Sequence, residues 1–188
     1  MSKQIIKPFE LLLEYERRSV AHALGGSSND ESVEDWSGIG FKVGNDLLVS
    51  EVDYINEVVI LPELIRIPGI DAWVLGLVNI RSNLIPAIDL KQYLFGEPSR
   101  ITKHSRMLII DQPGGQAGLV VDEVFGQRHF QQKMWQDIAQ EDSNKQNLLT
   151  YCEKFFNVED VNWNVFLVNR LVHDANFQNA SGKINIKR

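Results

Sequence analysis

The sequence has few of the features that would cross-link it or place it in a membrane. It holds a single cysteine, Cys152, among 188 residues, so no intramolecular disulfide forms and packing alone holds the fold, as in a reducing compartment. The first residues place Lys3, Lys7 and Glu10 among apolar side chains, whereas a secretion signal needs an uncharged apolar stretch. The longest such stretch, residues 72–80, is about half the length of a membrane-spanning helix. We expect a cytoplasmic protein without membrane insertion.

Positive charge is also scarce. The chain has 19 Lys and Arg residues against 25 Asp and Glu residues, which gives a formal net charge of −6. A protein with this balance has no overall positive field to attract nucleic acid, and no strip of interleaved basic and aromatic residues suggests RNA binding. With 44% hydrophobic and 23% charged residues, the composition is typical of an ordinary globular protein. The length suits one domain, or two compact subdomains that share a core.

Motifs for nucleophilic catalysis and metal binding are missing. No G-x-S-x-G sequence presents a serine nucleophile. No two histidines are four residues apart, as a local zinc site on a helix would require. The four histidines are scattered along the chain, at His22, His104, His129 and His173. We therefore predict no catalytic residues, no metal site and no cofactor.

Two further patterns are better explained by structure than by chemistry. Gly38 and Gly40 form a G-x-G pair, but the segment enters a predicted hairpin, whereas a dinucleotide site leaves a strand for a helix. Asp122 and Glu123 are adjacent in a predicted strand, so their side chains point to opposite faces and do not flank one reacting bond. A small β-barrel enzyme is therefore a less favoured alternative to a noncatalytic protein.

The N-terminal region differs from the rest of the chain. Residues 8–24 have apolar side chains at helical spacing and no Gly or Pro in the interior, which predicts an amphipathic helix. The following residues contain Asp30, Glu31, Glu34 and Asp35 without a basic residue, as in a solvated linker. Residues 1–37 are thus predicted to be a helix and an acidic linker, and residues 179–188 a disordered tail.

Short β-branched runs separated by turn residues predict that the remaining chain is mainly β. Hairpins are expected at residues 39–49, 74–89 and 107–124, with turns at 44–46, 82–83 and 113–116. Further strands are expected at 57–60, 148–156 and 163–168, and a helical turn at 90–94. We expect two small antiparallel β-subdomains, with most residues before Ser99 in the first, much of 106–156 in the second, and terminal strands that cross between them.

An ordered set of segments resembles the CheW adaptor family. The matching segments are INEV (55–58), LIRIPG (64–69), GLVNIR (76–81), IPAIDL (85–90), GLVVDEV (118–124) and, more weakly, residues 163–171. The first six residues of the predicted helix, PFELLL (8–13), and LVHDANF (171–177) resemble the branch of this family that serves pilus chemosensory systems. The sequence departs from the family pattern at Ser82, where glycine is usual, and around residues 151–156, which lack a common glycine.

The resemblance implies two small β-barrels over residues 38–178 and a noncatalytic scaffold. It implies that the chain joins the regulatory domain of a CheA-like histidine kinase to the cytoplasmic tip of a methyl-accepting chemoreceptor, at membrane-associated arrays that control type IV pilus twitching motility. A flagellar chemotaxis adaptor is the alternative within the same family. The positions carried over as partner-binding candidates are Val52, Ile55, Glu57, Val58, Asn79 and Arg81.

For each of these candidates a purely structural role is the competing interpretation. Val52, Ile55 and Val58 individually suit an apolar core better than an interface, because a β-rich chain needs inward-facing apolar side chains. Asn79 suits a turn-stabilising role. For Arg81, which ends the most apolar run of the chain, the resemblance favours recognition. We further predict that Glu57 and Arg81 lie together on the first subdomain as an exposed ion pair.

Overall fold

The computed structural model describes residues 35–138 and 146–182. The predicted N-terminal helix, the linker up to residue 34 and the last six residues lie outside the described part. At both ends of the described part, secondary structure extends beyond the boundaries predicted for the folded domain. The first strand begins at Asp35 within the expected linker, and the last helix covers residues 179–182 of the expected tail.

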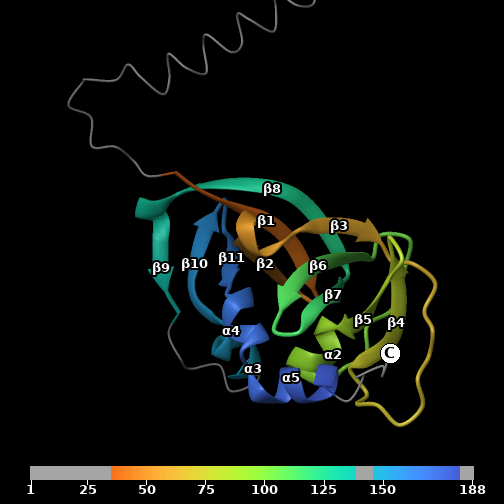
Figure 1. Cartoon of the computed structure of the whole chain (residues 1–188). Coiled ribbons are helices and arrows are strands. Elements are labelled where there is room, and N and C mark those ends of the chain that lie inside the picture. Colours follow the sequence, from red (N-terminus) through yellow and green to blue (C-terminus); the bar gives the residue numbers. More distant parts are fainter. Residues whose placement is uncertain (1–34, 139–145, 183–188) are drawn as a thin grey trace, which may run out of the picture. The chain divides into compact units, whose positions relative to one another are not determined.

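Within the described residues, eleven strands form two sheets, whose arrangement is drawn in Figure 1. The six-stranded sheet A contains, in spatial order, β8 (Glu123–Gln131), β1 (Asp35–Val43), β2 (Asp46–Glu51), β11 (Val161–Phe166), β10 (Cys152–Val158) and β9 (Trp135–Asp137). The five-stranded sheet B contains β3 (Glu57–Ile60), β6 (Arg106–Gln112), β7 (Gly115–Val121), β5 (Asn83–Asp89) and β4 (Val74–Ile80). The helical elements are η1 (Val52–Tyr54), α2 (Leu90–Phe95), η2 (Gln132–Met134), α3 (Gln146–Thr150), α4 (Val168–Val172) and α5 (Ala175–Gly182).

The mainly β fold with two subdomains is confirmed, and most of the predicted division holds: β3, β4 and β5 share sheet B, β8, β9 and β10 share sheet A, and the terminal strands β1 and β2 cross to sheet A. The prediction is wrong for β6 and β7, which complete sheet B. Each sheet also contains one parallel pair, β2 with β11 and β5 with β7, and is otherwise antiparallel. The chain crosses between the sheets around Asp122, whose backbone N–H donates to Lys42 O at 3.0 Å.

The three predicted hairpins are present, because their turn residues tolerate the backbone that tight turns need. The predicted helical turn is α2, which Asp89 caps at its N-terminus and Gly96, with φ 73°, ends in the left-handed conformation. Two predicted strands are wrong in part. The strand expected at 117–124 divides into β7 and β8 at Asp122, and the first residues of 148–156 form the end of α3.

Three apolar clusters hold the described residues together. One lies within sheet B around Val78, Met107 and Val120, and another lies within sheet A around Phe130, Phe156 and Val165. The largest joins side chains of both sheets, such as Phe41 and Leu119, with the C-terminal helices. Because the alternate faces of the strands pack into different clusters, each sheet has its own core and shares the third.

Candidate partner-binding surface

The tip of the β4–β5 hairpin has an uncommon backbone conformation. Arg81 and Ser82 have φ values of 49° and 70°, and the flanking Ile80 and Asn83 are paired in the ladder. Positive φ at both central residues is the signature of a type I′ turn, which matches the twist of a two-residue hairpin. The turn therefore lies at residues 81–82, one residue before the predicted position, and it directs the Arg81 side chain into solvent.

Replacing Ser82 with glycine is expected to stabilise the protein. At Ser82 the left-handed backbone costs a side-chain-bearing residue about 1 kcal/mol that glycine does not incur, which explains the glycine that the family usually has here. We expect the free energy of unfolding to rise by about 0.5–1 kcal/mol in Ser82→Gly. Urea unfolding measures this change, and a fall in stability would contradict this account of the turn.

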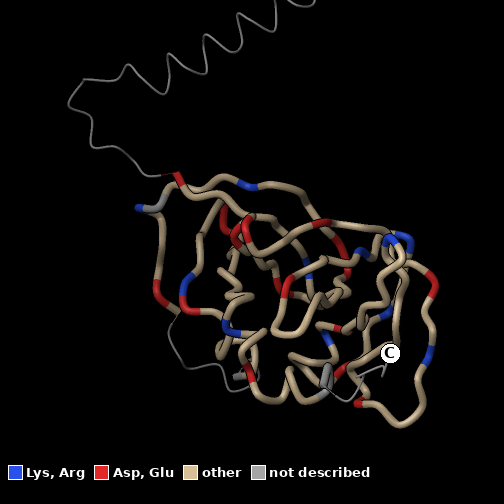
Figure 2. Tube along the Cα trace, in the orientation of Figure 1, with Lys and Arg blue, Asp and Glu red and all other residues tan. Residues whose placement is uncertain are grey.

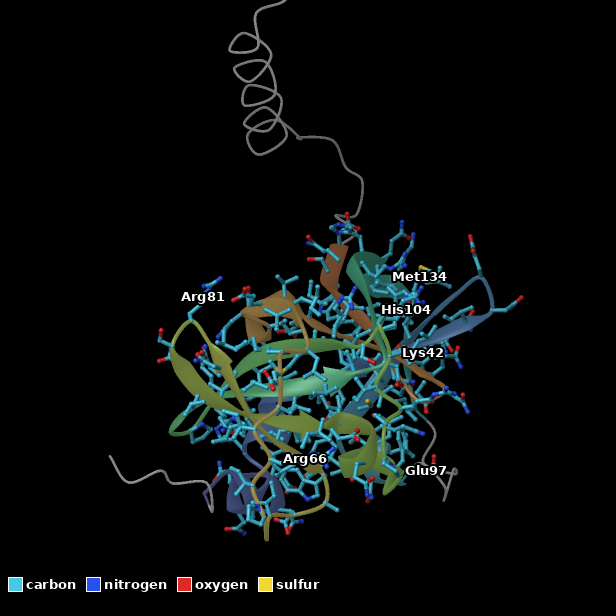
Figure 3. The ribbon with its side chains drawn as sticks, turned by 90° about the vertical axis from the view of Figure 1, so that its right-hand side faces the viewer. Lys42, Arg66, Arg81, Glu97, His104 and Met134 are labelled. Atoms are coloured by element: carbon cyan, nitrogen blue, oxygen red, sulfur yellow. The ribbon has the colours of Figure 1, made fainter. Side chains whose placement is uncertain are left out.

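Glu57 and Arg81 form the predicted ion pair. Arg81 Nη2 donates to Glu57 Oε1 at 3.0 Å, although the residues are 24 positions apart in the chain. The Arg81 side chain is 79% exposed and that of Glu57 is 34% exposed, so this pair adds little to folding. The contact places the hairpin tip beside the start of β3, and Figure 3 shows Arg81 at the outer end of that hairpin.

Exposed apolar side chains also occur on β3, on the strand face opposite Glu57, and on the β4–β5 hairpin. Along β3 the exposure alternates, and Val58 and Ile60 are 39% and 73% exposed. Leu84, which pairs with Asn79 across the hairpin, is 48% exposed. We call the set of Glu57, Val58, Ile60, Asn79, Arg81 and Leu84 the β3–hairpin surface. Exposed apolar groups together with an exposed guanidinium are typical of protein-binding sites.

The exposure of the six predicted residues shows which of them belong to the core and which reach the surface. Ile55 is 8% exposed and belongs to the shared core, so its role in binding is at most one of support. Val52, in η1, is 36% exposed and Val58 is 39% exposed, so the core interpretation is wrong for both. Asn79 is exposed within β4, not within the turn. Five of the six predicted residues thus reach the surface wholly or in part.

A second concave surface was not predicted from the sequence. Two adjoining cavities, of about 540 Å³ and about 410 Å³, share Tyr54, Asn169 and His173 as lining residues. We call this surface the Tyr54 groove. It joins η1 to α4 and to the β6–β7 turn, elements that are far apart in the sequence and that no local pattern connects.

The Tyr54 groove is lined by carboxylates. Glu51, Asp53, Asp111 and Asp174 lie along it. Hydrogen bonds from Asn56 and Gln116 lower the pKa of Asp111, so this carboxylate is charged at neutral pH. The guanidinium of Arg170, also in the groove, is paired with Glu153. The groove therefore favours partners that offer basic or hydrogen-bond-donating side chains.

Neither a metal-binding cluster nor a reactive thiol is found in the part of the chain that the structure describes. Residues 35–138 and 146–182 contain no group of three or more His, Cys, Asp or Glu side chains placed to hold a metal ion. Burial raises the pKa of the Cys152 thiol to about 12, so this thiol stays protonated and unreactive at neutral pH. No helix of the described part is long and apolar enough to span a bilayer. Figure 2 shows acidic and basic residues interspersed along the trace.

The comparison with protein families decides the identity. The model of the CheW-like domain matches residues 37–171. The chain belongs to the CheW-like family. As a member it is a noncatalytic scaffold protein, and the prediction that it is not an enzyme is confirmed.

Similar proteins agree with this assignment. The CheW-like chain is 39% identical over 123 residues to Protein PilI of Pseudomonas aeruginosa. This match covers 65% of this chain and 69% of PilI. It is 28% identical over 110 residues to the chemotaxis protein CheW of Helicobacter pylori, covering 58% of this chain and 66% of that protein. The predicted resemblance to the pilus branch is therefore confirmed at the level of sequence similarity.

A solved structure supports the fold. The crystal structure of the scaffolding protein TtCheW from Thermoanaerobacter tengcongensis matches with a TM-score of 0.57. The match covers 70% of this CheW-like chain and 88% of TtCheW at 24% sequence identity. At this identity the match establishes the shared arrangement of the two sheets.

Proposed function

We propose that this CheW-like protein couples the cytoplasmic tip of a methyl-accepting chemoreceptor to the regulatory domain of a CheA-like histidine kinase, in a pilus chemosensory system that controls twitching motility. The protein acts in the cytoplasm, at membrane-associated arrays. The observation that carries the proposal is the β3–hairpin surface, which combines an exposed guanidinium, paired with Glu57, with exposed apolar side chains of β3 and β5. The similarity to PilI supports the pilus system.

A coupling protein needs two separate contacts, and the described residues offer two surfaces of different chemistry. The β3–hairpin surface presents apolar groups and a bidentate donor, which suits a folded domain with a complementary carboxylate or carbonyl. The Tyr54 groove is concave and lined by carboxylates, which suits a receptor tip that carries basic or amide side chains. We assign the kinase domain to the first and the receptor tip to the second.

A flagellar chemotaxis adaptor is the second candidate. Local similarity to a chemotaxis protein supports it, since the chain is 34% identical over 58 residues to the chemotaxis protein CheW of Bacillus subtilis. That match covers 31% of this chain and 37% of the relative. The longer and closer match to PilI favours the pilus system.

Binding measurements with both sets of partners test the proposal. The full chain is immobilised and titrated with the kinase regulatory domains and receptor cytoplasmic fragments of the pilus and the flagellar systems from the same organism. We expect saturable binding to the pilus pair, and simultaneous binding of both partners in one complex. Binding to the flagellar pair alone would replace the leading proposal with the second candidate, and binding to neither would overturn both.

A further inference from the structure

A polar cavity opens at the seam between the two sheets, away from both surfaces assigned above. It has a volume of about 670 Å³, and its lining includes Lys42, Gly44, Lys91, Glu97, Arg100 and Asp122. We call it the seam pocket. None of its lining residues belongs to the β3–hairpin surface or the Tyr54 groove. Figure 3 shows Lys42 and Glu97 well separated from Arg81.

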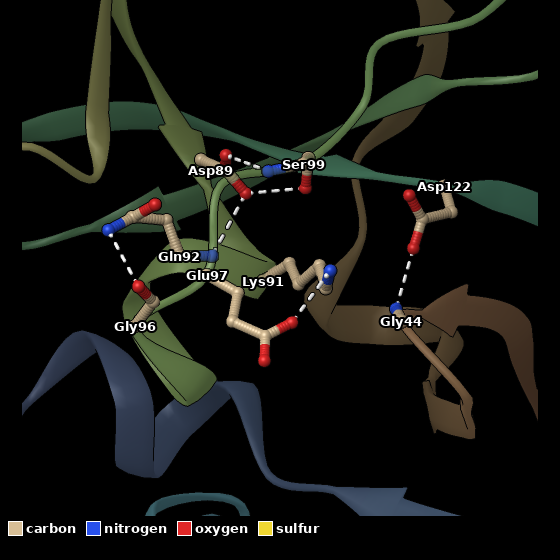
Figure 4. Close-up of polar contacts among 8 residues, drawn as sticks. All are labelled: Gly44, Asp89, Lys91, Gln92, Gly96, Glu97, Ser99 and Asp122. Atoms are coloured by element: carbon tan, nitrogen blue, oxygen red, sulfur yellow. Dashed lines mark hydrogen bonds and ion pairs between the residues drawn. The ribbon is translucent and has the colours of Figure 1, made fainter.

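Hydrogen bonds hold the walls of the seam pocket in place (Figure 4). The buried carboxylate of Asp89 accepts from Ser99 N at 2.8 Å and from Ser99 Oγ at 2.6 Å, which fixes the loop that carries Arg100. On the opposite wall, Gly44 N donates to Asp122 Oδ2 at 2.6 Å. The pocket is therefore formed before any partner binds, which lowers the entropic cost of binding.

In the seam pocket the carboxylates have partners within the protein, whereas two of the basic side chains have none among the described residues. The Asp122 carboxylate is occupied by Gly44 N, and Glu97 Oε2 pairs with Lys91 Nζ at 3.1 Å. Asp46 is 8% exposed and also has a partner. Lys42 and Arg100 line the same cavity and have no ion pair within the described part of the chain. The groups left to bind a ligand are thus an ammonium and a guanidinium, which select carboxylates.

The chain itself carries a segment with the complementary charge. Between residues 25 and 37 there are four acidic side chains and no basic one. We propose that the seam pocket binds the acidic segment around Asp30, Glu31 and Glu34 of a second copy of this chain. The contact is head to tail, because pocket and segment are different surfaces, so successive copies link into a ring or a chain. It adds self-assembly to the adaptor role and does not depend on the proposed partners.

The geometry favours a second copy over the chain's own segment. Asp35 begins β1, whereas Lys42 and Gly44 lie at the other end of that strand. At about 3.3 Å per residue, β1 separates Asp35 from Lys42 by about 23 Å, and Asp30 is at most about 17 Å from Asp35, so a contact within one chain requires a fully extended segment. The acidic segment would also have to run back along β1, whose two edges are already paired with β2 and β8.

Sedimentation velocity of the full chain tests this proposal with two complementary variants. The pocket variant is K42E/R100E, and the segment variant is D30N/E31Q/E34Q. We expect wild type to self-associate with concentration and each variant alone to remain monomeric. An equimolar mixture should form a heterodimer, because the segment of the pocket variant meets the intact pocket of the other.

Self-association through charged groups should depend on ionic strength and should not respond to a charge reversal outside the seam pocket. Raising the ionic strength from about 0.1 M to about 1 M shortens the Debye length from about 10 Å to about 3 Å, so self-association should weaken on the order of tenfold. K133E reverses an exposed lysine of η2 outside the pocket and should associate as wild type does. Circular dichroism confirms that each variant is folded, and R100Q provides a milder pocket change.

Three results would overturn the proposal. One is a wild-type protein that stays monomeric at low salt and millimolar concentration. Another is self-association that K42E/R100E and R100Q leave unchanged, which would place the interface elsewhere. The third is a mixture of the two folded variants that forms no heterodimer while wild type does associate. Loss of association in K133E with retention in R100Q would point instead to contact between the segment and η2.

Discussion

Replacing Arg81 with glutamate is expected to weaken binding of the kinase regulatory domain strongly and to leave the fold intact. In wild type the guanidinium is 79% exposed and 3.0 Å from Glu57. Glutamate removes the donor fork and places a second negative charge beside Glu57 and the partner's acceptor groups. We expect at least about a thirtyfold increase in Kd, equivalent to about 2 kcal/mol, as for a central interface residue. Titration calorimetry with each isolated partner measures this change.

Stability measurements separate this effect from unfolding. An exposed ion pair contributes about 0–1 kcal/mol to folding, so the melting temperature of Arg81→Glu should stay within about 4 °C of wild type. Arg81→Ala should bind with intermediate affinity, since it removes the contact without adding repulsion. A folded Arg81→Glu protein that binds the kinase regulatory domain with wild-type affinity would show that Arg81 is not a recognition residue.

The charge-swapped double variant Glu57→Arg/Arg81→Glu distinguishes two ways in which Arg81 acts. The swap restores an attraction between the two positions, so a role limited to tying the hairpin to β3 would be rescued. A guanidinium that contacts the partner directly is not restored at its own position. We expect the double variant to remain defective in binding, and recovery to wild-type affinity would make Arg81 a positioning residue.

The features that local sequence determines were predictable. The hairpins and the capped helix α2 follow from local turn and cap residues. The Glu57–Arg81 pair joins residues 24 positions apart and was predicted from the positions of the family motifs. The placement of β6 and β7 in sheet B was not predictable from local residues, because it depends on the crossover at Asp122, where a polar residue interrupts an apolar run. A single carboxylate that caps Gly44 has no local signature that distinguishes it from a surface aspartate.

Surfaces that form between distant segments were missed for the same reason. The Tyr54 groove needs η1, α4 and the β6–β7 turn to meet, and the seam pocket needs β1, α2 and the Ser99 loop. Exposure was equally hard to predict for Val52 and Val58, since an apolar residue in a β-rich chain looks the same in a core and at an interface. The partner-binding candidates came from the resemblance to the CheW family, because residue patterns alone do not distinguish them from core positions.

Replacing Gly38 with alanine is expected to destabilise sheet A strongly. A Cβ atom at Gly38 would lie 2.4 Å from the backbone oxygen of Ser50, 2.7 Å from Trp36 Cη2 and 2.8 Å from Val49 Cγ2. The Ser50 oxygen belongs to the paired strand β2 and moves only if the strands separate. We expect a loss of about 1–3 kcal/mol in the free energy of unfolding, which calorimetry should record as a melting temperature lower by about 3–10 °C.

Gly40→Ala is the matched control, on the same strand and the same face as Gly38. There a Cβ atom would lie 2.9 Å from Trp163 Cζ3 and 3.0 Å from Arg128 Cγ, both of which are side-chain atoms. Because side chains adjust where a paired backbone does not, Gly40→Ala should be the milder change. Equal stability of the two variants would contradict this account. The G-x-G pair thus serves the close packing of strands, which explains why glycines stand at positions where a nucleotide-binding role was excluded.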